Sequence, residues 1–382
     1  MQDPKLTYIG SGQQLFRIAP AVKRSRSYLA SRPVVELEIH DVAFGGAGVG
    51  RVDGKIVFVP LTIDGERVEA ELIEHRSGFD RAQLKKIVLR SVHRAEPVCP
   101  VFGRCGGCDY QHIAYDHQLE LKRRQVKKLL ERIGRISDVE VSPTIPCANQ
   151  YAFRNRITVH AMQGRIGFFA KNSRNVVDVE FCAIASPAVN EELKELRAKG
   201  LRDGQHRTLR GAGVPPTFTQ TNEFIATALL EYLASHATGE VLVDAYCGSG
   251  FFGHALADRF RSVIGLDWSE PAIAAARKAA NPNEEYVCGD VSEAIESVLE
   301  KYHPETVILD PSADGVQGRV TDALATKPPN RLIYVSCNPA TLARDLSRLK
   351  KRFRVIAIQP FDMFPQTAEI EAVAVLERVA SG

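Results

Sequence analysis

The chain has 382 residues, of which 45% are hydrophobic and 25% are charged, and it contains no low-complexity tract. This length predicts two or three domains, because a single hydrophobic core rarely grows so large. No apolar stretch reaches the roughly 18 residues that cross a bilayer, and residues 1–30 lack the apolar core and cleavage site of a signal peptide. A monomeric, cytoplasmic protein without membrane association is therefore expected, and the formal net charge of +3 says little about nucleic acid.

Residues 34–89 are predicted to form five short strands joined by glycine-rich turns. Apolar and acidic residues alternate over 35–39, as in a half-buried strand. Glycines crowd residues 44–50, and further strand patterns follow at 55–59, 67–73 and 82–89. Five short strands in this length are typical of a small OB-like β-barrel. The first domain is expected to span residues 30–92.

The middle segment, residues 93–213, is predicted to be an α+β domain. A basic helix over 118–133 is followed by two paired strands at 154–160 and 164–169. Five basic residues cluster on this helix, and they form either a solvated face or contacts to RNA phosphates. They are Lys122, Arg123, Arg124, Lys127 and Lys128, and Arg154 and Arg156 add a second basic pair.

The last segment, residues 214–382, alternates apolar strands with helices and is predicted to be a doubly wound parallel α/β sheet. The expected strands are 241–244, 263–267, 306–310 and 331–335, and the expected helices include 253–260 and 271–280. The fold class is thus multidomain α/β, with a barrel, a central α+β domain and a Rossmann-like sheet.

A glycine turn after the first strand of this sheet predicts a ligand site. Gly248 and Gly250 let the backbone approach a ligand closely, at the edge where open α/β sheets bind ligands. Acids end three successive strands at Asp244, Asp267 and Asp290. Acids suit the positive sulfonium and amino groups and the ribose of S-adenosylmethionine. The alternative is that these acids merely cap helices.

Cys337 ends an apolar strand beside this pocket and is a candidate nucleophile. A thiolate that adds to carbon 6 of uracil makes carbon 5 nucleophilic, and a base must then remove the carbon 5 proton. Glu371 is the better candidate for the base, with Glu369 two residues earlier on the same strand face as competitor. Asp310 is placed to hydrogen-bond the uracil edge or the thiol region, and Thr341 is expected to cap the next helix.

Eight cysteines in a chain without a secretion signal indicate burial, metal binding or catalysis rather than disulfides. Three thiols lie close together in the sequence, and one later thiol is the natural fourth ligand: Cys99, Cys105, Cys108 and Cys182. Four thiolates hold either zinc or an iron–sulfur cluster. The 3+1 spacing favours a 4Fe–4S cluster over zinc. The remaining thiols apart from Cys337 are expected to be buried or incidental: Cys147, Cys247 and Cys288.

In these motifs the chain resembles the RNA 5-methyluridine methyltransferases of the iron–sulfur, TRAM-containing type. The matching residues extend from about 34 to 376 and follow the same order as in that family. They comprise Gly-Val-Gly-Arg-Val-Asp-Gly-Lys at 48–55, Cys-x5-Cys-Gly-Gly-Cys at 99–108, Phe-Thr-Gln-Thr-Asn at 218–222, Asp-x-Tyr-Cys-Gly-x-Gly at 244–250, Ser-Cys-Asn-Pro at 336–339 and Asp-Met-Phe-Pro-x-Thr at 362–367.

The resemblance implies a role for each matching site residue. Cys337 would be the nucleophile and Glu371 the base. Gln220 and Asp267 would bind the donor, with Tyr246 and Asp310 at the pocket, and the four cysteines would hold a 4Fe–4S cluster. The barrel, similar to TRAM domains, would help to bind folded RNA. The chain departs from the family where an arginine usually follows Asp-Pro-Pro, since residues 310–313 read Asp-Pro-Ser-Ala, and at Gln366 and Glu369, where histidines are common.

The target uridine must be unpaired or flipped out to reach a thiolate at a strand end. 23S ribosomal RNA is the first expected substrate and transfer RNA the second. Phe361 and Phe364 are expected either to wall the base pocket or to lie in the core. A non-catalytic RNA-binding iron–sulfur protein is the alternative from another class. RNA 5-methylcytosine methyltransferases usually carry a Pro-Cys motif that residues 310–312 lack.

Overall fold

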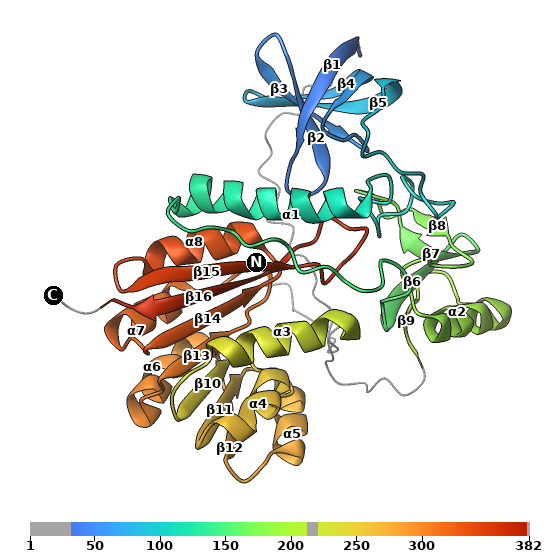
Figure 1. The fold of residues 1–382 in the computed structure, drawn as a ribbon. Helices are drawn as coiled ribbons and strands as arrows, with labels where there is room; N and C mark the ends of the chain where they lie inside the picture. Colours follow the sequence, from blue (N-terminus) through green and yellow to red (C-terminus); the bar gives the residue numbers. More distant parts are fainter. Residues whose placement is uncertain (1–31, 212–220, 380–382) are drawn as a thin grey trace, which may run out of the picture.

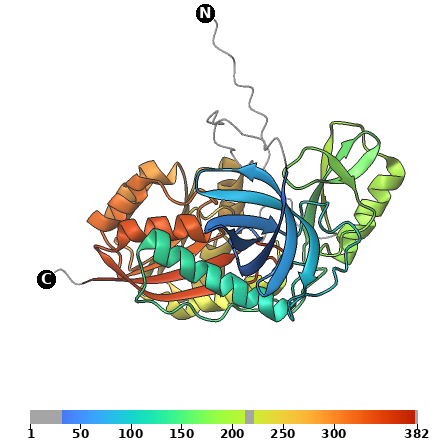
Figure 2. The same cartoon turned by 90° about the horizontal axis from the view of Figure 1, so that it is seen from above.

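The computed structural model describes residues 32–211 and 221–379, which form a barrel and two open sheets (Figure 1). The barrel lies at one end of the molecule, above the long helix α1 (Tyr115–Leu129), and the large sheet lies on the other side of this helix. The small central sheet lies beside both. Figure 2 shows the same arrangement from above, with the barrel over α1. No helix among the described residues is long and apolar enough to cross a membrane.

The N-terminal barrel closes in the strand order β1-β2-β3-β5-β4, and its alternating pattern puts Leu37 and Ile39 inside. Gly48 permits the close approach of strand and loop, because a Cβ there would meet Thr62 Oγ1 at 1.9 Å. The prediction of five strands and a small barrel is confirmed. The strands are β1 (Val34–Val42), β2 (Ala47–Val52), β3 (Lys55–Pro60), β4 (Glu66–His75) and β5 (Phe79–Leu89).

The central sheet has the strand order β8-β7-β6-β9, with helix α2 packed on one face. Alternate residues such as Val159 and Leu209 are buried against Val189 and Leu193 of α2. The predicted pairing of the strands near 154–160 and 164–169 is confirmed. The elements are β6 (Arg156–Met162), β7 (Arg165–Phe169), β8 (Val176–Asp178), α2 (Pro187–Lys199) and β9 (His206–Arg210).

The large sheet has seven strands in the order β12-β11-β10-β13-β14-β16-β15, and strands β10 to β14 are parallel. Strand β16 is antiparallel to both of its neighbours. The predicted doubly wound sheet is confirmed. The strands are β10 (Val241–Ala245), β11 (Ser262–Asp267), β12 (Glu284–Cys288), β13 (Thr306–Leu309), β14 (Arg331–Ser336), β15 (Phe353–Phe361) and β16 (Glu371–Arg378).

Helices cover both faces of this sheet and bury its apolar strands. One core joins the sheet to α6 (Val291–Tyr302), α7 (Gly318–Thr326) and α8 (Pro339–Leu349), and it also takes Val126 and Leu130 from the central segment. The other core joins it to α3 (Glu223–His236) and α4 (Phe251–Leu256). Helix α5 (Glu270–Ala279) packs on Tyr286 in a small cluster of its own.

Three predicted helix ends differ from the structure for local reasons. The helix expected over 118–133 begins at Tyr115, and a π-helical turn (Leu130–Gly134) replaces its last residues. The helix expected over 253–260 is α4 followed by a 3₁₀ turn (Ala257–Arg259). The cap of α8 is Asn338, whose side chain accepts from Ala340 N at 3.1 Å, so the prediction of Thr341 as cap was wrong.

Helix α1 joins the barrel to the large sheet through polar side chains on its buried face. Gln125 Nε2 donates to Val42 O of the barrel at 2.9 Å. Lys122, fully buried, donates through Nζ to Asp362 Oδ1 at 2.6 Å and to Phe364 O at 3.0 Å. Gln118 and Gln366 exchange two further hydrogen bonds of 3.0 and 3.1 Å. One helix thus fixes the loop that precedes β16 relative to the barrel.

Removal of the Lys122 ammonium is expected to destabilise the fold strongly. Lys122→Ala leaves the buried carboxylate of Asp362 without its cation, which costs about 3–5 kcal/mol in comparable buried pairs. Chemical denaturation measures this cost as a decrease in the free energy of unfolding. Lys127→Ala on the exposed side of the same helix is the control and is expected to change it by less than about 0.5 kcal/mol. Equal effects of both variants would contradict a structural role for the pair.

Candidate functional site

The carboxyl ends of neighbouring strands gather the candidate residues at one edge of the large sheet. The register pairs Ala245 with both Leu266 and Leu309, so the residues that follow these strands lie next to one another. Asp267 is itself paired with Cys288 at the end of β12. The site therefore begins as a row of strand ends, as expected for a ligand site in an open α/β sheet.

Three carboxyl groups at this edge share one electrostatic neighbourhood. Burial together with the charges of Asp310 and Asp267 raises the pKa of Asp244 to about 8. Burial and Asp267 likewise raise the pKa of Asp310 to about 7. Asp244 accepts from Gly253 N at 3.0 Å through Oδ2, whereas its buried Oδ1 has no hydrogen-bond partner in the described structure. Repelling carboxyl groups and an unpartnered oxygen fit a cationic, hydrogen-bonding ligand such as S-adenosylmethionine.

The glycine turn after β10 adopts backbone conformations that leave room at this edge. Tyr246 has φ of 67°, an uncommon value for a residue with a side chain, and Gly248 has φ of 55°. A Cβ at Gly248 would meet nothing within 4 Å, so the backbone there borders open space. A Cβ at Gly250 would instead meet the Tyr286 hydroxyl at 2.6 Å, so only glycine fits over this ring. Sequence reasoning missed Tyr286, which has no motif signal.

Asp267 and Asp290 also serve the backbone. Asp267 accepts from Gly248 N at 3.0 Å and from Ser269 N at 2.8 Å, and it therefore holds the turn to its neighbour strand. Asp290 lies two residues beyond β12 and caps α6 by accepting from Ser292 N at 2.7 Å. The capping alternative thus describes part of what Asp290 does. Gln220, another expected donor-binding residue, lies outside the described residues.

Cys337 and Glu371 face one another across two strand ends. Strand β14 pairs Ser336 with Ala372 of antiparallel β16, so the next residues outward are Cys337 and Glu371. Burial and the charges of Glu371, Asp310 and Glu369 raise the pKa of Cys337 to about 12. Burial, Asp310 and Glu369 raise the pKa of Glu371 well above that of a free carboxyl group. The structure therefore brings one thiol and three carboxyl groups together.

Glu369 differs from Glu371 in position and partner. It precedes β16 rather than lying on it, so the expectation that both acids share a strand face was wrong. Glu369 is exposed and pairs with Arg154 Nη2 at 3.3 Å, whereas Glu371 is buried. The Arg154 guanidinium also lies over the Phe364 ring, 5.5 Å from its centroid. Phe361 is fully buried in the core, so of the two aromatic candidates Phe364 alone is near the surface.

The loop after Asp310 is held without an arginine at residue 313. Asn338 Nδ2 donates to Ala313 O at 3.1 Å, and Arg344 Nη2 donates to Asp314 O at 2.8 Å. Asp345, fully buried, accepts from Val316 N at 3.0 Å and ends the loop. These residues of α8 and its cap follow Cys337 directly, so the loop and the thiol share one support. Sequence reasoning did not single out Asn338 as that support.

The polar face of α1 is a second feature that sequence reasoning missed. The Asp-Met-Phe-Pro loop receives hydrogen bonds from Lys122 and Gln118, as described above. The spacing of 118, 122 and 125 among buried apolar residues of one helix was an available signal, because polar side chains on a buried helix face need partners. The sequence predicts only a solvated face or an RNA contact for the basic run. Lys122 is neither, and Arg124 and Lys128 pair with Asp41 of the barrel.

The four candidate metal-binding cysteines lie in one region next to the central sheet. Burial and the charges of Cys182 and Cys99 raise the pKa of Cys105 to about 11, and those of Cys182 and Cys105 act in the same way on Cys108, at about 12. Within residues 32–211 and 221–379, no three His, Cys, Asp or Glu side chains converge closely enough to hold a metal ion as they stand. All four candidate ligands are thiols from one region, and thiolates are the ligands of iron–sulfur clusters. Their positions in the structure are too far apart to hold a metal ion.

The other cysteines differ in exposure. Cys147 and Cys247 are buried, in agreement with the expectation, whereas Cys288 is exposed. The backbone N–H of Cys147 donates to the Tyr115 hydroxyl at 2.8 Å, which ties the central segment to α1.

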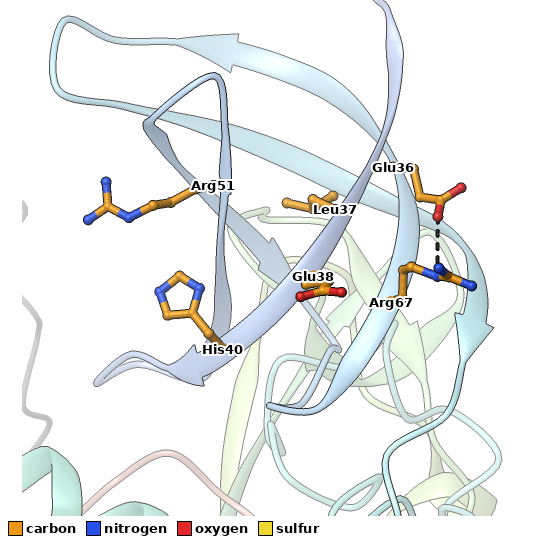
Figure 3. Close-up of a pocket in the computed structure, with 6 residues that line it drawn as sticks. All are labelled: Glu36, Leu37, Glu38, His40, Arg51 and Arg67. Atoms are coloured by element: carbon orange, nitrogen blue, oxygen red, sulfur yellow. Dashed lines mark ion pairs between the residues drawn. The ribbon is translucent and has the colours of Figure 1, made fainter.

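A depression on the outer face of the barrel is remote from the thiol and has a mixed lining. Figure 3 shows its six residues, with Arg51 and His40 on one side and the pair Glu36–Arg67 on the other. The carboxylate of Glu36 lies 3.2 Å from Arg67 Nε, so part of its charge is already neutralised. The lining therefore combines two glutamates with His40 and two arginines at a surface.

Comparisons with known proteins match three parts of the chain. A family model described as tRNA (Uracil-5-)-methyltransferase matches residues 292–379, a methyltransferase domain matches residues 242–310, and a TRAM domain matches residues 31–85. The first match contains Cys337 and Glu371, and the second contains the glycine turn.

Relatives match over nearly the whole length. Proteins named as uncharacterized RNA methyltransferases of Bdellovibrio bacteriovorus and Gloeobacter violaceus are each 30% identical over 90% of this chain, and the alignments cover 94% and 96% of those proteins. The crystal structure of a Pyrococcus abyssi tRNA (uracil-54, C5)-methyltransferase with S-adenosyl-L-homocysteine is 25% identical. It covers 90% of this chain and 100% of its own, with a TM-score of 0.70.

The large sheet with its acidic edge is therefore a class I methyltransferase fold, and the barrel belongs to a TRAM domain. Together, the fold, the site and these relatives show that the chain belongs to the TRAM-containing RNA 5-methyluridine methyltransferases, which use S-adenosylmethionine.

Proposed function

We propose that this enzyme methylates carbon 5 of one uridine in 23S ribosomal RNA through a covalent bond between Cys337 and carbon 6 of the base. The observation that carries this proposal is the register of β14 and β16, which sets Cys337 opposite Glu371. A nucleophile and a base are the two protein groups that this reaction needs, and Asp310 lies in the same electrostatic neighbourhood.

Each proposed step has a residue to perform it. The Cys337 thiolate adds to carbon 6, which forms a carbon–sulfur bond and moves the electron pair to an enolate whose carbon 5 is nucleophilic. When bound, S-adenosylmethionine would supply the methyl group to that carbon, with cleavage of the sulfur–methyl bond and S-adenosylhomocysteine as the leaving group. Glu371 then takes the carbon 5 proton, the double bond re-forms, and the carbon–sulfur bond breaks to release Cys337. A buried carboxylate with a raised pKa is a stronger base than a free one, which suits it to this proton.

The donor would bind along the row of strand ends described above. Asp267 would accept from the ribose hydroxyls, and Asp244 and Asp310 would offset the positive charge of the donor. Asp290 lies beside the next strand end, where the adenine would lie. The remaining proposed contacts are the glycine turn and one residue outside the described range: Tyr246, Gly248, Gly250 and Gln220.

Transfer RNA is the second candidate substrate, since the Pyrococcus abyssi relative is a tRNA methyltransferase that acts at uracil-54. In either case the TRAM barrel would help to bind the folded RNA. The proposed division of the chain is residues 30–92 for this barrel, 93–213 for the central domain and 214–382 for the methyltransferase domain. Residues such as Val126 and Val141 of the central part nevertheless share a core with the large sheet.

A 4Fe–4S cluster on Cys99, Cys105, Cys108 and Cys182 is part of the proposal. It is supported by an all-thiol donor set in one neighbourhood, in which the thiols raise one another's pKa. Closure of these loops around a cluster would release the thiol protons, because metals bind thiolates. We assign the cluster a role in folding, since the region contacts β7 through Gly106 N, which donates to Phe169 O at 3.0 Å.

Methyl transfer to RNA tests the function directly. Purified protein with S-adenosylmethionine is expected to add 5-methyluridine to 23S ribosomal RNA taken from cells that lack this gene, as measured by mass spectrometry of the digested RNA. Transfer RNA from the same cells is the parallel substrate, and methylation of this RNA alone would move the target to the second candidate. If neither RNA gained the mass of a methyl group, the proposed methyltransferase activity would be contradicted, and the alternative of an RNA-binding protein would be favoured.

Two variants separate the proposed nucleophile from the proposed base. Cys337→Ala is expected to abolish turnover and to form no bond to RNA. Glu371→Gln is expected to reduce turnover by more than about 100-fold, yet to accumulate a protein–RNA adduct that survives denaturing electrophoresis. Full turnover of Cys337→Ala would exclude the covalent route. Arg207→Ala, on the exposed edge of the central sheet, is the control and is expected to keep wild-type turnover.

The rate of methyl transfer is expected to rise with pH. The pKa of Cys337 is raised to about 12, so the reactive thiolate is a minor species at neutral pH and increases about tenfold per pH unit. The raised pKa of Glu371 acts in the same direction, because the protonated form cannot accept the carbon 5 proton. Single-turnover rates at saturating RNA and donor, measured from pH 6 to 9, check this slope. A rate that falls over this range would contradict the proposed chemistry.

The cluster predicts a coloured protein. Anaerobically purified protein is expected to absorb visible light as iron–sulfur proteins do and to contain about four irons per chain. Cys108→Ser is expected to lose colour and iron together, whereas Cys288→Ser, at an exposed thiol elsewhere, is the matched control and is expected to keep both. Stoichiometric zinc in a colourless protein would overturn this assignment.

A further inference from the structure

The central sheet has one face buried under α2 and one face that α2 does not cover. Strands β6 and β9 pair Arg156 with Arg210, Thr158 with Thr208, and His160 with His206. The alternate residues are buried against α2, so these three pairs lie on the opposite face. Figure 1 shows α2 as the outermost element on this side, so the opposite face looks toward the rest of the molecule. We call the three pairs, together with Phe169, the ladder face.

The ladder face presents aromatic rings next to polar groups. The rings of His160 and Phe169 stack with centroids 4.0 Å apart, and His206 lies 5.9 Å from His160. The hydroxyls of Thr158 and Thr208 lie 2.9 Å apart. Phe169 and His160 are half-buried and His206 is exposed, so ring surface remains accessible. Accessible aromatic rings on a strand surface are the platforms on which unpaired bases stack.

Positive charge gathers at the end of the ladder face nearest the loop that precedes β16. Burial and the charges of Arg210 and Arg154 lower the pKa of Arg156, so three guanidinium groups act on one another. Arg210 Nη1 is buried without a hydrogen-bond partner in the described structure, as is Arg154 Nε. Buried donors without partners carry a free-energy cost that a ligand oxygen would relieve. An anion with several acceptor oxygens, such as a phosphodiester, fits this group.

The arginine group borders the proposed active site through Arg154. Its guanidinium contacts Glu369 and the Phe364 ring, and Glu369 precedes the proposed base by two residues. A strand of RNA whose phosphate binds at Arg156 and Arg210 would therefore lie next to the nucleotide that enters the site. Three basic residues of α1 are already paired within the protein, namely Lys122, Arg124 and Lys128.

We propose that the ladder face binds a single-stranded segment of the substrate RNA beside the target uridine, with a phosphate at Arg156 and Arg210 and a base stacked near His160 and Phe169. This inference rests on the proposed function, since it names the surface that holds the RNA for the same site. It makes the central sheet a reader of unpaired RNA, next to a barrel that would bind folded RNA.

Binding of a fluorescein-labelled 12-nucleotide oligouridine to the whole protein, followed by fluorescence anisotropy, tests the face. The double variant Arg156→Ala with Arg210→Ala is expected to bind about tenfold more weakly or worse. Its plot of log Kd against log salt is expected to be shallower by about 0.7, because the contact to one phosphate of a single strand contributes about 0.7. His160→Ala is expected to weaken binding about tenfold without changing this slope.

Two controls distinguish a site from a general loss of charge or of fold. Arg207→Ala removes one charge from the same strand but on the α2 side, and it is expected to bind as the wild type does. Replacement of Arg156 and Arg210 by lysine is expected to keep most of the salt slope. Thermal unfolding checks that each variant is folded. Equal weakening by Arg207→Ala, or wild-type binding and slope in the double alanine variant, would overturn the inference.

Methyl transfer separates this inference from the proposed function. With 23S ribosomal RNA as substrate, the double alanine variant is expected to raise KM about tenfold or more while kcat stays within about threefold of the wild type. If the double alanine variant transferred methyl groups with an unchanged KM, the RNA-binding role of the ladder face would be contradicted, and the proposed function would not be affected. If the wild-type protein methylated no RNA but the double variant still bound oligouridine more weakly than the wild type, the proposed function would be wrong and the ladder face would stand as an RNA-binding surface.

Discussion

The buried ion pair between Lys122 and Asp362 is the contact on which the arrangement of this enzyme depends. Both side chains are fully buried, one on the long helix of the central segment and the other in the loop before the last strand. Two charges out of water are tolerated only with close partners, and Lys122 meets this need with Asp362 and a backbone carbonyl. The same helix is bonded to the barrel through Gln125. The TRAM domain and the proposed base are thus fixed to a common element, so an RNA bound by one has a defined position at the other.

The chemistry of the site follows from where strands end. Four of the five parallel strands bring an acid to one edge, and burial together with neighbouring charges raises the pKa of Asp244 and Asp310. Such an edge favours a cationic methyl donor, and a bound cation in turn lowers the pKa of the acids around it. The thiol and the proposed base occupy the neighbouring strand ends, where burial and the charges of Glu371, Asp310 and Glu369 disfavour a free thiolate. The thiolate of Cys337 is therefore a minor species at neutral pH.

Much of this could be predicted from the sequence, because the signals are local. The alternation of apolar and polar residues predicts the barrel strands, and apolar runs predict the parallel sheet. A glycine turn and a cysteine at strand ends predict the candidate site. Long-range contacts have no such signal. Lys122 and Asp362 are 240 residues apart in the sequence. A cluster of basic residues on a helix therefore predicts a solvent-exposed face, because the sequence does not indicate the distant carboxylate. Glu369 was expected on the strand with Glu371, but the strand begins only at Glu371 and the earlier acid turns to Arg154. The ladder face depends on which strand pairs with β6, which periodicity alone does not decide.

The antiparallel direction of β16 has a consequence for how the enzyme is made. Each parallel strand reaches the edge that carries the site with its last residue. Strand β16 runs in the opposite direction, so it reaches this edge with its first residue, Glu371. It lies between β14 and β15 in the sheet. The donor edge is complete once β14 has been synthesised, but the thiol gains its opposing carboxyl group only when the final strand leaves the ribosome and pairs with Ser336 and its neighbours. Since domains fold as they emerge, a nascent chain stalled before this strand carries the acidic edge and the thiol but lacks the proposed base. The pairing of the thiol with this carboxyl group therefore waits for β16, which follows β14 and β15 in the chain.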